Sequence, residues 1–202
     1  MRLLVVTAVA AERDAVVAGG VEAVAVGVGG AAAAAGTARL LASGDYRAVV
    51  CAGIGGGLTT PLGGTALATV SIAADLGAES PDGFIPLSTL GFGADTHPVD
   101  RDLLAALGRL LPEAVRGPIL SVNTVTGTAS STRALRDRYP DAVAEGMEGF
   151  GVASAAAGAG VPFAELRTIS TPVGPRDRDA WRIGDALAAL TAAGRALGKL
   201  AW

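Results

Sequence analysis

Hydrophobic and polar positions alternate along this chain in short blocks that predict strands followed by helices. Compact runs of β-branched and aliphatic residues are typical of buried strands, and they occur at Leu3–Val6, Val21–Val28, Ala48–Ile54, Thr65–Ala74, Ile119–Val125, Ala142–Glu145 and Phe163–Ile169. The segments between them predict helices at Ala11–Val17, Gly29–Ala42, Asp100–Leu110, Ser130–Tyr139, Gly149–Gly160 and Ala180–Leu200. This alternation indicates an α/β fold in which helices flank a central, mostly parallel mixed sheet on both faces.

One segment, 75–99, interrupts the alternation. Its many Gly, Pro, Asp and Ser residues predict a long loop. Compact domains rarely contain such a long structureless segment unless it is functional or disordered. Because the segment also contains Phe84, Ile85, Leu87 and Leu90, we expect it to form a pocket wall or a contact between subunits. Exposed apolar patches of that kind usually mark contacts, so a homo-oligomer, a dimer or higher, is expected.

Length, composition and charge narrow the class of protein. A chain of 202 residues suits one domain, spanning residues 1–202, and half of its residues are hydrophobic, which is enough for a sizeable core. The net charge is -3 and no basic patch stands out, so a nucleic-acid partner is not expected.

The sequence also argues against a membrane segment and a reactive thiol. Residues 48–74 carry no charge, but the glycines and Pro61 within them argue against a lipid-exposed helix. The first apolar run is too short for a signal peptide, so we expect a cytoplasmic protein with no membrane partner. Cys51, the only cysteine, lies in an apolar run and is predicted to be a buried small hydrophobe.

Candidate chemistry gathers where predicted strands end. Met147 and Glu148 follow a short strand, and Arg167–Ser170 ends a later strand and opens into a loop rich in Pro, Gly and Arg. Open α/β sheets bind ligands at the carboxyl ends of their strands, so this pattern predicts a small-molecule pocket. Glu12 follows the first strand, although its spacing alone favours a Glu that stabilises the first turn of a helix.

Several motifs, in this order and spacing, cover nearly the whole chain. They are Thr7-Ala8 through Glu12, Gly53-Ile54-Gly55-Gly56-Gly57-Leu58, Ala74-Asp75-Leu76-Gly77-Ala78-Glu79, Val122-Asn123-Thr124-Val125-Thr126-Gly127-Thr128, Met147-Glu148-Gly149-Phe150 and Val173-Gly174-Pro175-Arg176-Asp177. Together they resemble the purine nucleosidase and phosphorylase family, and the last three favour its futalosine branch. The resemblance implies a nucleoside phosphorylase-like fold. It also implies hydrolysis of the N-ribosidic bond of futalosine, releasing hypoxanthine and dehypoxanthine futalosine, in an alternative menaquinone pathway.

The resemblance also implies roles for the two glutamates. Glu12 corresponds to the family's water-activating base, and Glu148 to the Glu that accepts hydrogen bonds from the ribose hydroxyls, which are strong because they are charge-assisted. Met147 would pack against the sugar. Gly53 and Ile54 belong to the family loop beneath the ribose, where an apolar residue in place of a polar one favours water over phosphate as the nucleophile.

One position departs from the adenine-specific relatives, in which an Asp follows the Ser of the R-x-I-S motif and protonates the purine. Here Thr171 follows Ser170. Threonine is no strong acid, but its hydroxyl can donate a hydrogen bond. An Asp would repel the carbonyl oxygen of hypoxanthine, so its loss points towards a 6-oxopurine. Ser170, Thr171 or a backbone N–H could then assist departure of the base.

The remaining substrate contacts are less specific. Arg176 is a candidate partner for the benzoate carboxylate of futalosine, or else a solvated surface residue. Phe84 and Phe150 are candidates to flank the purine or the benzoate, with core packing as the alternative, and Val125 lies in a family motif. The single His97 has no partners at ligand spacing, so neither a metal nor another cofactor is expected.

Other functions fit the same motifs. The chain could be a nucleosidase or phosphorylase for another purine nucleoside, such as methylthioadenosine. It could also be a non-catalytic nucleoside-binding protein that kept the fold, because Thr171 leaves activation of the leaving group open.

Overall fold

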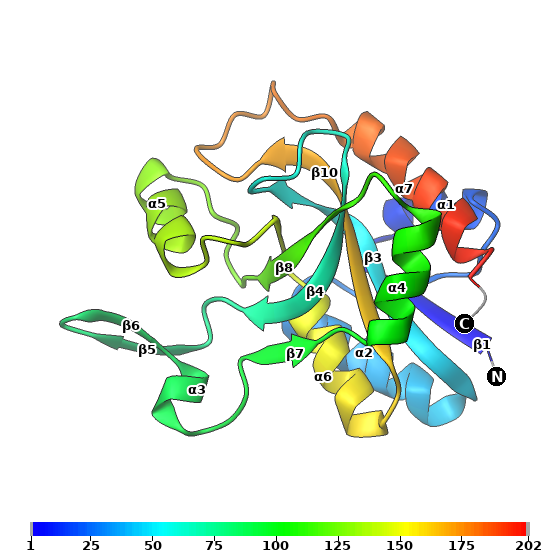
Figure 1. Cartoon of the computed structure of the whole chain (residues 1–202), viewed down its shortest axis with the longest axis horizontal. Coiled ribbons are helices and arrows are strands. Elements are labelled where there is room, and N and C mark those ends of the chain that lie inside the picture. Colours follow the sequence, from blue (N-terminus) through cyan, green and yellow to red (C-terminus); the bar gives the residue numbers. More distant parts are fainter. Residues whose placement is uncertain (1, 201–202) are drawn as a thin grey trace.

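The computed structural model describes residues 2–200, in which helices flank a mixed sheet of eight strands (Figure 1). The strands are β1 (Arg2–Thr7), β2 (Val24–Ala25), β3 (Tyr46–Gly57), β4 (Thr65–Ala73), β5 (Gly77–Ser80), β6 (Gly83–Pro86), β7 (Thr96–Pro98), β8 (Val115–Ser121), β9 (Ala144–Gly146) and β10 (Phe163–Pro172). The helices are α1 (Ala10–Ala18), α2 (Gly30–Ser43), α3 (Leu87–Leu90), α4 (Arg101–Leu110), α5 (Ala129–Arg138), α6 (Gly149–Ala159) and α7 (Ile183–Leu197).

The sheet closes on itself around the long strand β3. Strand β3 runs parallel to β1 and to β10, and β1 in turn runs parallel to β2. On its other side, β10 pairs with β4 in the antiparallel sense. Strands β4, β8 and β9 then follow one another in parallel. Strand β9 pairs with β3 in the antiparallel sense, which closes the sheet. The prediction of an α/β fold with a mostly parallel mixed sheet is therefore confirmed.

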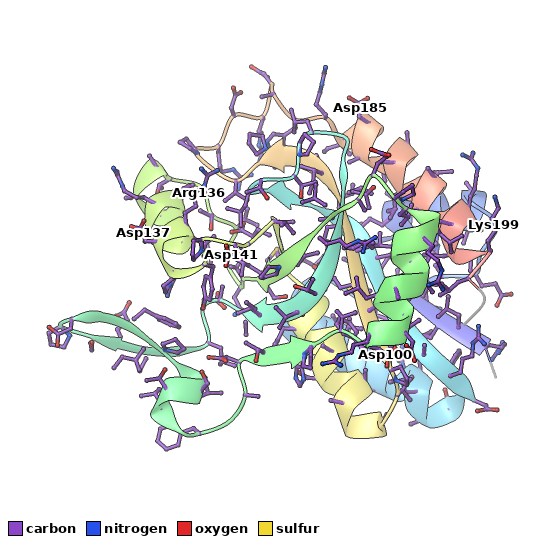
Figure 2. The ribbon with its side chains drawn as sticks, viewed as in Figure 1. Asp100, Arg136, Asp137, Asp141, Asp185 and Lys199 are labelled. Atoms are coloured by element: carbon purple, nitrogen blue, oxygen red, sulfur yellow. The ribbon has the colours of Figure 1, made fainter. Side chains whose placement is uncertain are left out.

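Small side chains let the helices lie close to one another. Helix α2 packs along α6, and α1 packs along α7 (Figure 1). A Cβ atom at Gly151 of α6 would collide with the backbone of Gly30 at the start of α2, so glycine is needed at that crossing. Helix α4 begins after Asp100, whose Oδ1 accepts hydrogen bonds from the N–H groups of Asp102 (3.0 Å) and Leu103 (2.9 Å) (Figure 2). This side-chain cap explains the helix start that the sequence predicts.

The prediction that 75–99 is a loop was wrong. The segment contains the hairpin β5–β6, the short helix α3 and the strand β7, which pairs with β4. The hairpin turn is stabilised locally, because Ser80 Oγ donates to the carbonyl of Gly83 (2.8 Å) and accepts from the N–H of Asp82 (3.3 Å). Gly83 has a φ of 117°, which an L side chain rarely adopts. Ser80, Asp82 and Gly83, which contributed to the prediction of a loop, are therefore residues of a tight turn.

Other boundaries shift for similar reasons. The strand predicted at Val21–Val28 is reduced to Val24–Ala25, before glycines with positive φ at 27 and 29. The strand predicted at Ile119–Val125 runs from Val115 to Ser121. It ends there because the backbone and side-chain N–H groups of Asn123 bind Asp75 (2.7 and 3.1 Å), which turns the chain out of the sheet. Asn and Asp side chains commonly compete with strand pairing in this way.

Candidate active site

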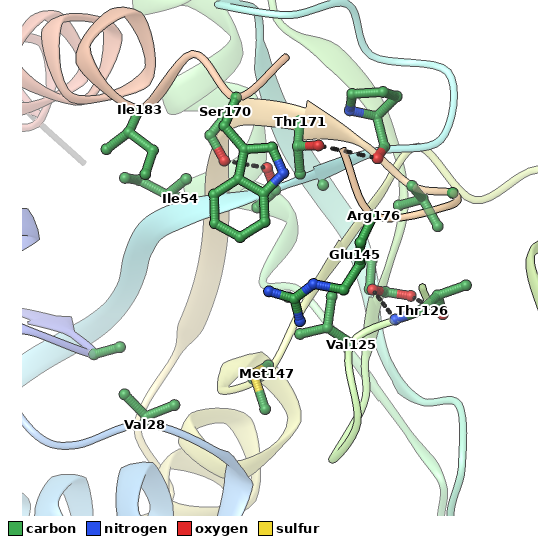
Figure 3. A pocket seen from close by; sticks show the side chains of 18 of the residues that line it. Val28, Ile54, Val125, Thr126, Glu145, Met147, Ser170, Thr171, Arg176 and Ile183 are labelled. Atoms are coloured by element: carbon green, nitrogen blue, oxygen red, sulfur yellow. Dashed lines mark hydrogen bonds between the residues drawn. The ribbon is translucent and has the colours of Figure 1, made fainter. Parts of the chain in front are cut away.

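A cavity of about 310 Å³ lies at the carboxyl ends of β1, β3 and β10 (Figure 3). Its volume falls within the range of small-molecule sites. Most residues that the sequence predicted for the site line this cavity, and they are Glu12, Ile54, Val125, Met147, Glu148, Ser170, Thr171 and Arg176. The fold therefore brings together side chains from its first and last strands.

Glu12 lies in the first turn of α1, after the end of β1, and only 5% of its surface is exposed. Its Oε2 accepts hydrogen bonds from the N–H groups of Ala8 (2.9 Å) and Val9 (3.3 Å). Its Oε1 accepts from the N–H of Ile54 on β3 (2.8 Å). These backbone bonds hold the carboxylate at the cavity wall, and its remaining lone pairs can still accept a hydrogen bond.

Glu148 lies just before α6, and its carboxylate is held from two sides. Its Oε1 accepts from the N–H of Gly29 (3.2 Å), and its Oε2 accepts from Nη1 of Arg167 (2.9 Å). Gly29 has a φ of 85°, a conformation that favours glycine, and this directs its N–H toward the carboxylate. Glu148 is thereby fixed in place and presents a charged acceptor to the cavity.

Arg167 is a site residue to which the sequence analysis gave no role. It is 1% exposed, and besides binding Glu148 it donates from Nε to Glu165 (3.0 Å) and from Nη2 to Sγ of Cys51 (3.3 Å). Burial raises the pKa of Glu165, and the Arg167 charge opposes that rise. The signal that could have revealed this cluster is the pair of charged residues, Glu165 and Arg167, within an otherwise apolar predicted strand.

Cys51 is buried, as predicted, and it packs against this cluster. Burial raises the pKa of its thiol well above the usual value, which keeps the thiol neutral. A neutral thiol is a poor nucleophile. Cys51 therefore acts as a small core residue that accepts a weak hydrogen bond from Arg167.

Gly53 lies beneath the cavity and is not among the residues that line it. A Cβ atom there would come within 2.9 Å of both Nη1 of Arg167 and Oε1 of Glu12. Glycine at this position therefore lets the guanidinium and the carboxylate approach the strand. Gly53 was predicted to bind substrate, whereas in the structure it packs against Arg167 and Glu12.

Glu145, on β9, lines the cavity, and its sequence pattern gave no indication of this. Its Oε1 accepts from the N–H of Thr126 (3.0 Å) and its Oε2 accepts from the Thr126 hydroxyl (2.5 Å). Burial raises the pKa of Glu145, and these two bonds lower it. The sequence analysis saw Glu145 only as the end of a short strand.

Hydroxyl groups and an arginine complete the wall. Ser170 Oγ donates a long hydrogen bond to the carbonyl of Gly55 (3.5 Å), and Thr171 Oγ1 donates to the carbonyl of Pro172 (3.3 Å). The guanidinium carbon of Arg176 lies 5.4 Å from the centre of the Trp181 ring, and both residues line the cavity. These weakly held hydroxyls can rotate to a ligand at little cost.

The two predicted phenylalanines lie elsewhere. Phe84, on β6, does not line the cavity. The centre of its ring lies 4.3 Å from the guanidinium carbon of Arg138. Phe150 lines a neighbouring cavity of about 260 Å³, and its ring centre lies 4.9 Å from that of His97. Met147 borders both cavities.

Two further observations concern the described residues 2–200. Within that range, no cluster of three or more His, Cys, Asp or Glu side chains is arranged to hold a metal ion. Within the same range, every helix is too short or too polar to span a lipid bilayer.

Comparison with known proteins shows similarity at two levels. The sequence pattern of the phosphorylase superfamily matches residues 9–202. A futalosine hydrolase of Streptomyces coelicolor is 49% identical, with all of this chain and 95% of the relative covered. A futalosine hydrolase of Acidothermus cellulolyticus is 46% identical, with all of this chain and 92% of the relative covered.

Solved structures match in fold at low sequence identity. A 5'-methylthioadenosine/S-adenosylhomocysteine nucleosidase of Neisseria meningitidis has a TM-score of 0.83 at 17% identity, covering 98% of this chain and 97% of that one. The corresponding nucleosidase of Helicobacter pylori has a TM-score of 0.84 at 18% identity, covering 99% and 97%. At this identity the likeness concerns the fold alone.

Proposed function

The chain belongs to the phosphorylase superfamily and, within it, to the futalosine hydrolase family, and we propose that it hydrolyses the N-ribosidic bond of futalosine. The products are hypoxanthine and dehypoxanthine futalosine. The observation that carries the proposal is the match to futalosine hydrolases along the whole chain. The presence of Glu12 and Glu148 on the wall of one cavity supports it, because hydrolysis of this bond uses a base for the attacking water and is helped by negative charge near the cation-like sugar.

In the proposed mechanism, Glu12 activates the water. As the bond from the ribose C1' to the purine nitrogen breaks, its electron pair leaves with the base and the sugar becomes cation-like, as in glycoside hydrolysis. The water oxygen attacks C1' and passes a proton to the Glu12 carboxylate. Such general-base assistance contributes roughly 100- to 10,000-fold. The backbone donors that hold Glu12 fix its position without any cost of reorganisation at the moment of reaction.

Glu148 binds the ribose hydroxyls in this mechanism. Its bonds to them strengthen as the ring gains positive charge, so they stabilise the transition state more than the ground state. Arg167 is a positioning residue, because it holds the Glu148 carboxylate from the buried side. Met147 packs against the sugar from the cavity wall.

The leaving purine is assisted by hydroxyl groups. Thr171 and Ser170 lie at the end of β10, on the cavity wall, and each hydroxyl donates a long hydrogen bond to a backbone carbonyl. A hydroxyl can donate to the carbonyl oxygen or N7 of hypoxanthine, and a proton from solvent completes the neutral base. Arg176, with Val125 opposite, contacts the benzoate end, because a guanidinium is a strong partner for a carboxylate.

A substrate panel tests the proposed function. Purified protein is incubated with futalosine, inosine and methylthioadenosine, and release of the free base is measured. Futalosine is expected to react with the highest kcat/KM, because its 6-oxopurine suits a site without an aspartate and its carboxylate suits Arg176. Equal or faster turnover of methylthioadenosine assigns another nucleosidase activity, and no base release from any of the three assigns a non-catalytic nucleoside-binding protein.

Changing Glu148 to Gln is expected to weaken both binding and turnover. The neutral amide loses the charge that the hydroxyl bonds and Arg167 depend on. The loss in kcat/KM should be roughly 10- to 100-fold for charged hydrogen bonds of this kind, and the preference for ribosides over 2'-deoxyribosides should narrow. Steady-state kinetics on inosine and 2'-deoxyinosine measure both effects. An unchanged preference for ribosides over 2'-deoxyribosides would show that Glu148 does not bind the ribose hydroxyls.

The protein is also proposed to be a cytoplasmic homo-oligomer of one-domain subunits. The supporting observation is apolar surface around the hairpin β5–β6 and helix α3, which project from the body of the molecule (Figure 1). Phe92 is 81% exposed there, and Leu76 is also exposed. Light scattering at micromolar concentration should give the mass of a dimer or larger, and Phe92→Ser should shift it toward the monomer. A monomeric wild type would contradict this assignment.

A further inference from the structure

Glu145 is a buried carboxylate that the proposed mechanism leaves unused. It is 3% exposed yet lines the same cavity as Glu12 and Glu148. Both hydrogen bonds that it accepts come from Thr126, so each carboxylate oxygen keeps a further lone pair (Figure 3). A buried carboxylate is stabilised by each further hydrogen bond that it accepts. On the wall of a ligand cavity, the remaining lone pairs of Glu145 can accept from a donor on the ligand.

The strand register places Glu145 relative to the leaving-group end of the site. Glu145 pairs with Gly56 on β3, and Gly56 pairs with Thr171 on β10. The three residues therefore form one row across the sheet, and the outer two are two strand spacings, or roughly 10 Å, apart. Gly56 has no side chain, and the space that its Cβ would take is bordered by Cγ2 of Val173, 2.8 Å away. The row therefore places the carboxylate and the hydroxyl along one stretch of the cavity wall, beside Val173.

The hydrogen-bonding edge of a 6-oxopurine presents two kinds of group in sequence. N7 and the carbonyl oxygen O6 are acceptors, and the adjacent N1–H is a donor. Adenine reverses the last two, because its 6-amino group is a donor and its N1 is an acceptor. A hydroxyl followed by a carboxylate therefore matches a 6-oxopurine, since the hydroxyl donates to O6 and the carboxylate accepts from N1–H.

We propose that Glu145 accepts a hydrogen bond from N1–H of the purine and is the residue that selects a 6-oxopurine over a 6-aminopurine. This inference rests on the proposed function, since it places the base of the nucleoside beside Thr171. The bond to N1–H attracts hypoxanthine, and the same carboxylate faces the N1 lone pair of adenine, which repels it. Specificity commonly combines an attractive contact for one ligand with a repulsive contact for its competitor.

Thr126 acts in this scheme as a positioning residue. Its N–H and hydroxyl hold the two oxygens of Glu145, which fixes the plane of the carboxylate at the wall. Burial raises the pKa of Glu145, and the two bonds from Thr126 oppose that rise. They favour the ionised form, which can accept from N1–H but cannot donate to the N1 of adenine. A side chain held in this way can discriminate between ligands without having to move.

The test compares futalosine with its 6-amino analogue on the wild type, Glu145→Gln and the exposed control Glu113→Gln. The Gln amide can turn either its oxygen or its nitrogen toward N1. In Glu145→Gln, the ratio of kcat/KM for futalosine over the 6-amino analogue should therefore fall by roughly 10- to 100-fold, the effect of one charged hydrogen bond. Glu113→Gln should leave this ratio unchanged.

The outcomes separate the possible failures. An equal fall for both substrates in Glu145→Gln means that the residue only supports the loop at Thr126, and this overturns the proposal while the hydrolase function stands. No base release from futalosine by the wild type overturns the proposed function itself. A comparison on the wild type alone guards against a variant that does not fold: inosine should react at least roughly tenfold faster than 1-methylinosine, which lacks the N1 donor. Equal rates would overturn the role of Glu145.

Discussion

Replacing Glu12 with Gln is expected to lower kcat for futalosine by at least roughly 100-fold while the substrate still binds. The amide cannot take the proton of the attacking water, whereas Glu148 still holds the ribose. Calorimetric binding and single-turnover rates measure the two effects separately. The separation matters because a group that acts only in the chemical step lowers the rate without weakening binding in proportion.

Local bonding complicates this variant, and the controls take account of it. Both oxygens of Glu12 accept hydrogen bonds from backbone N–H groups. In the Gln variant, the amide NH2 takes the place of one oxygen, so it faces a backbone N–H donor that it cannot bind. A stability loss of about 1–3 kcal/mol is expected from this mismatch, and thermal unfolding measures it. Glu113→Gln, at an exposed position, is the matched control. If Glu12→Gln folds and turns over at a near-normal rate, the attacking water has no assigned base and the mechanism fails.

Replacing Arg167 with Met is expected to lower the free energy of unfolding by about 3–5 kcal/mol. The change leaves the carboxylates of Glu148 and Glu165 without their cation, and the Glu165 side chain is fully buried. Removing one partner of a buried ion pair is costly because the remaining charge stays in a poorly solvating environment. Urea denaturation followed by fluorescence measures the loss.

The matched control for this variant is Arg13→Met. Arg13 also forms an ion pair, with Asp14 at 2.7 Å, but both side chains are exposed. An exposed pair of this kind contributes less than about 1 kcal/mol. Equal unfolding midpoints for Arg167→Met and Arg13→Met would show that the buried cluster does not stabilise the fold as described here.

The strands of the sheet centre could be predicted from sequence because burial on both faces gives continuous apolar runs. The predicted Ala48–Ile54 and Phe163–Ile169 lie within β3 and β10. The hairpin β5–β6 could not be predicted in this way, because it is held by turn bonds of Ser80 rather than by apolar pairing. Composition alone does not distinguish such a turn from an irregular loop.

The places of the candidate site residues could be predicted where these residues follow strand ends. They could not be predicted where they depend on contacts across the sheet. Glu12 and Glu148 follow strands, so their neighbourhood could be inferred from parallel packing. Arg167 lies in the interior of a strand, and its partners come from distant parts of the chain. Glu145 meets Thr126 only because β9 lies beside β8. Phe84 was misplaced because an aromatic side chain in a polar segment does not reveal which surface it packs on.

The most direct test of hydrolysis is product analysis of the futalosine reaction with and without inorganic phosphate. Chromatography with mass spectrometry identifies both the base and the sugar product. The account predicts hypoxanthine and dehypoxanthine futalosine in equal amounts, at the same rate in both buffers, because water held by Glu12 is the nucleophile. A sugar 1-phosphate that appears only with phosphate, or no hypoxanthine in either buffer, would contradict it.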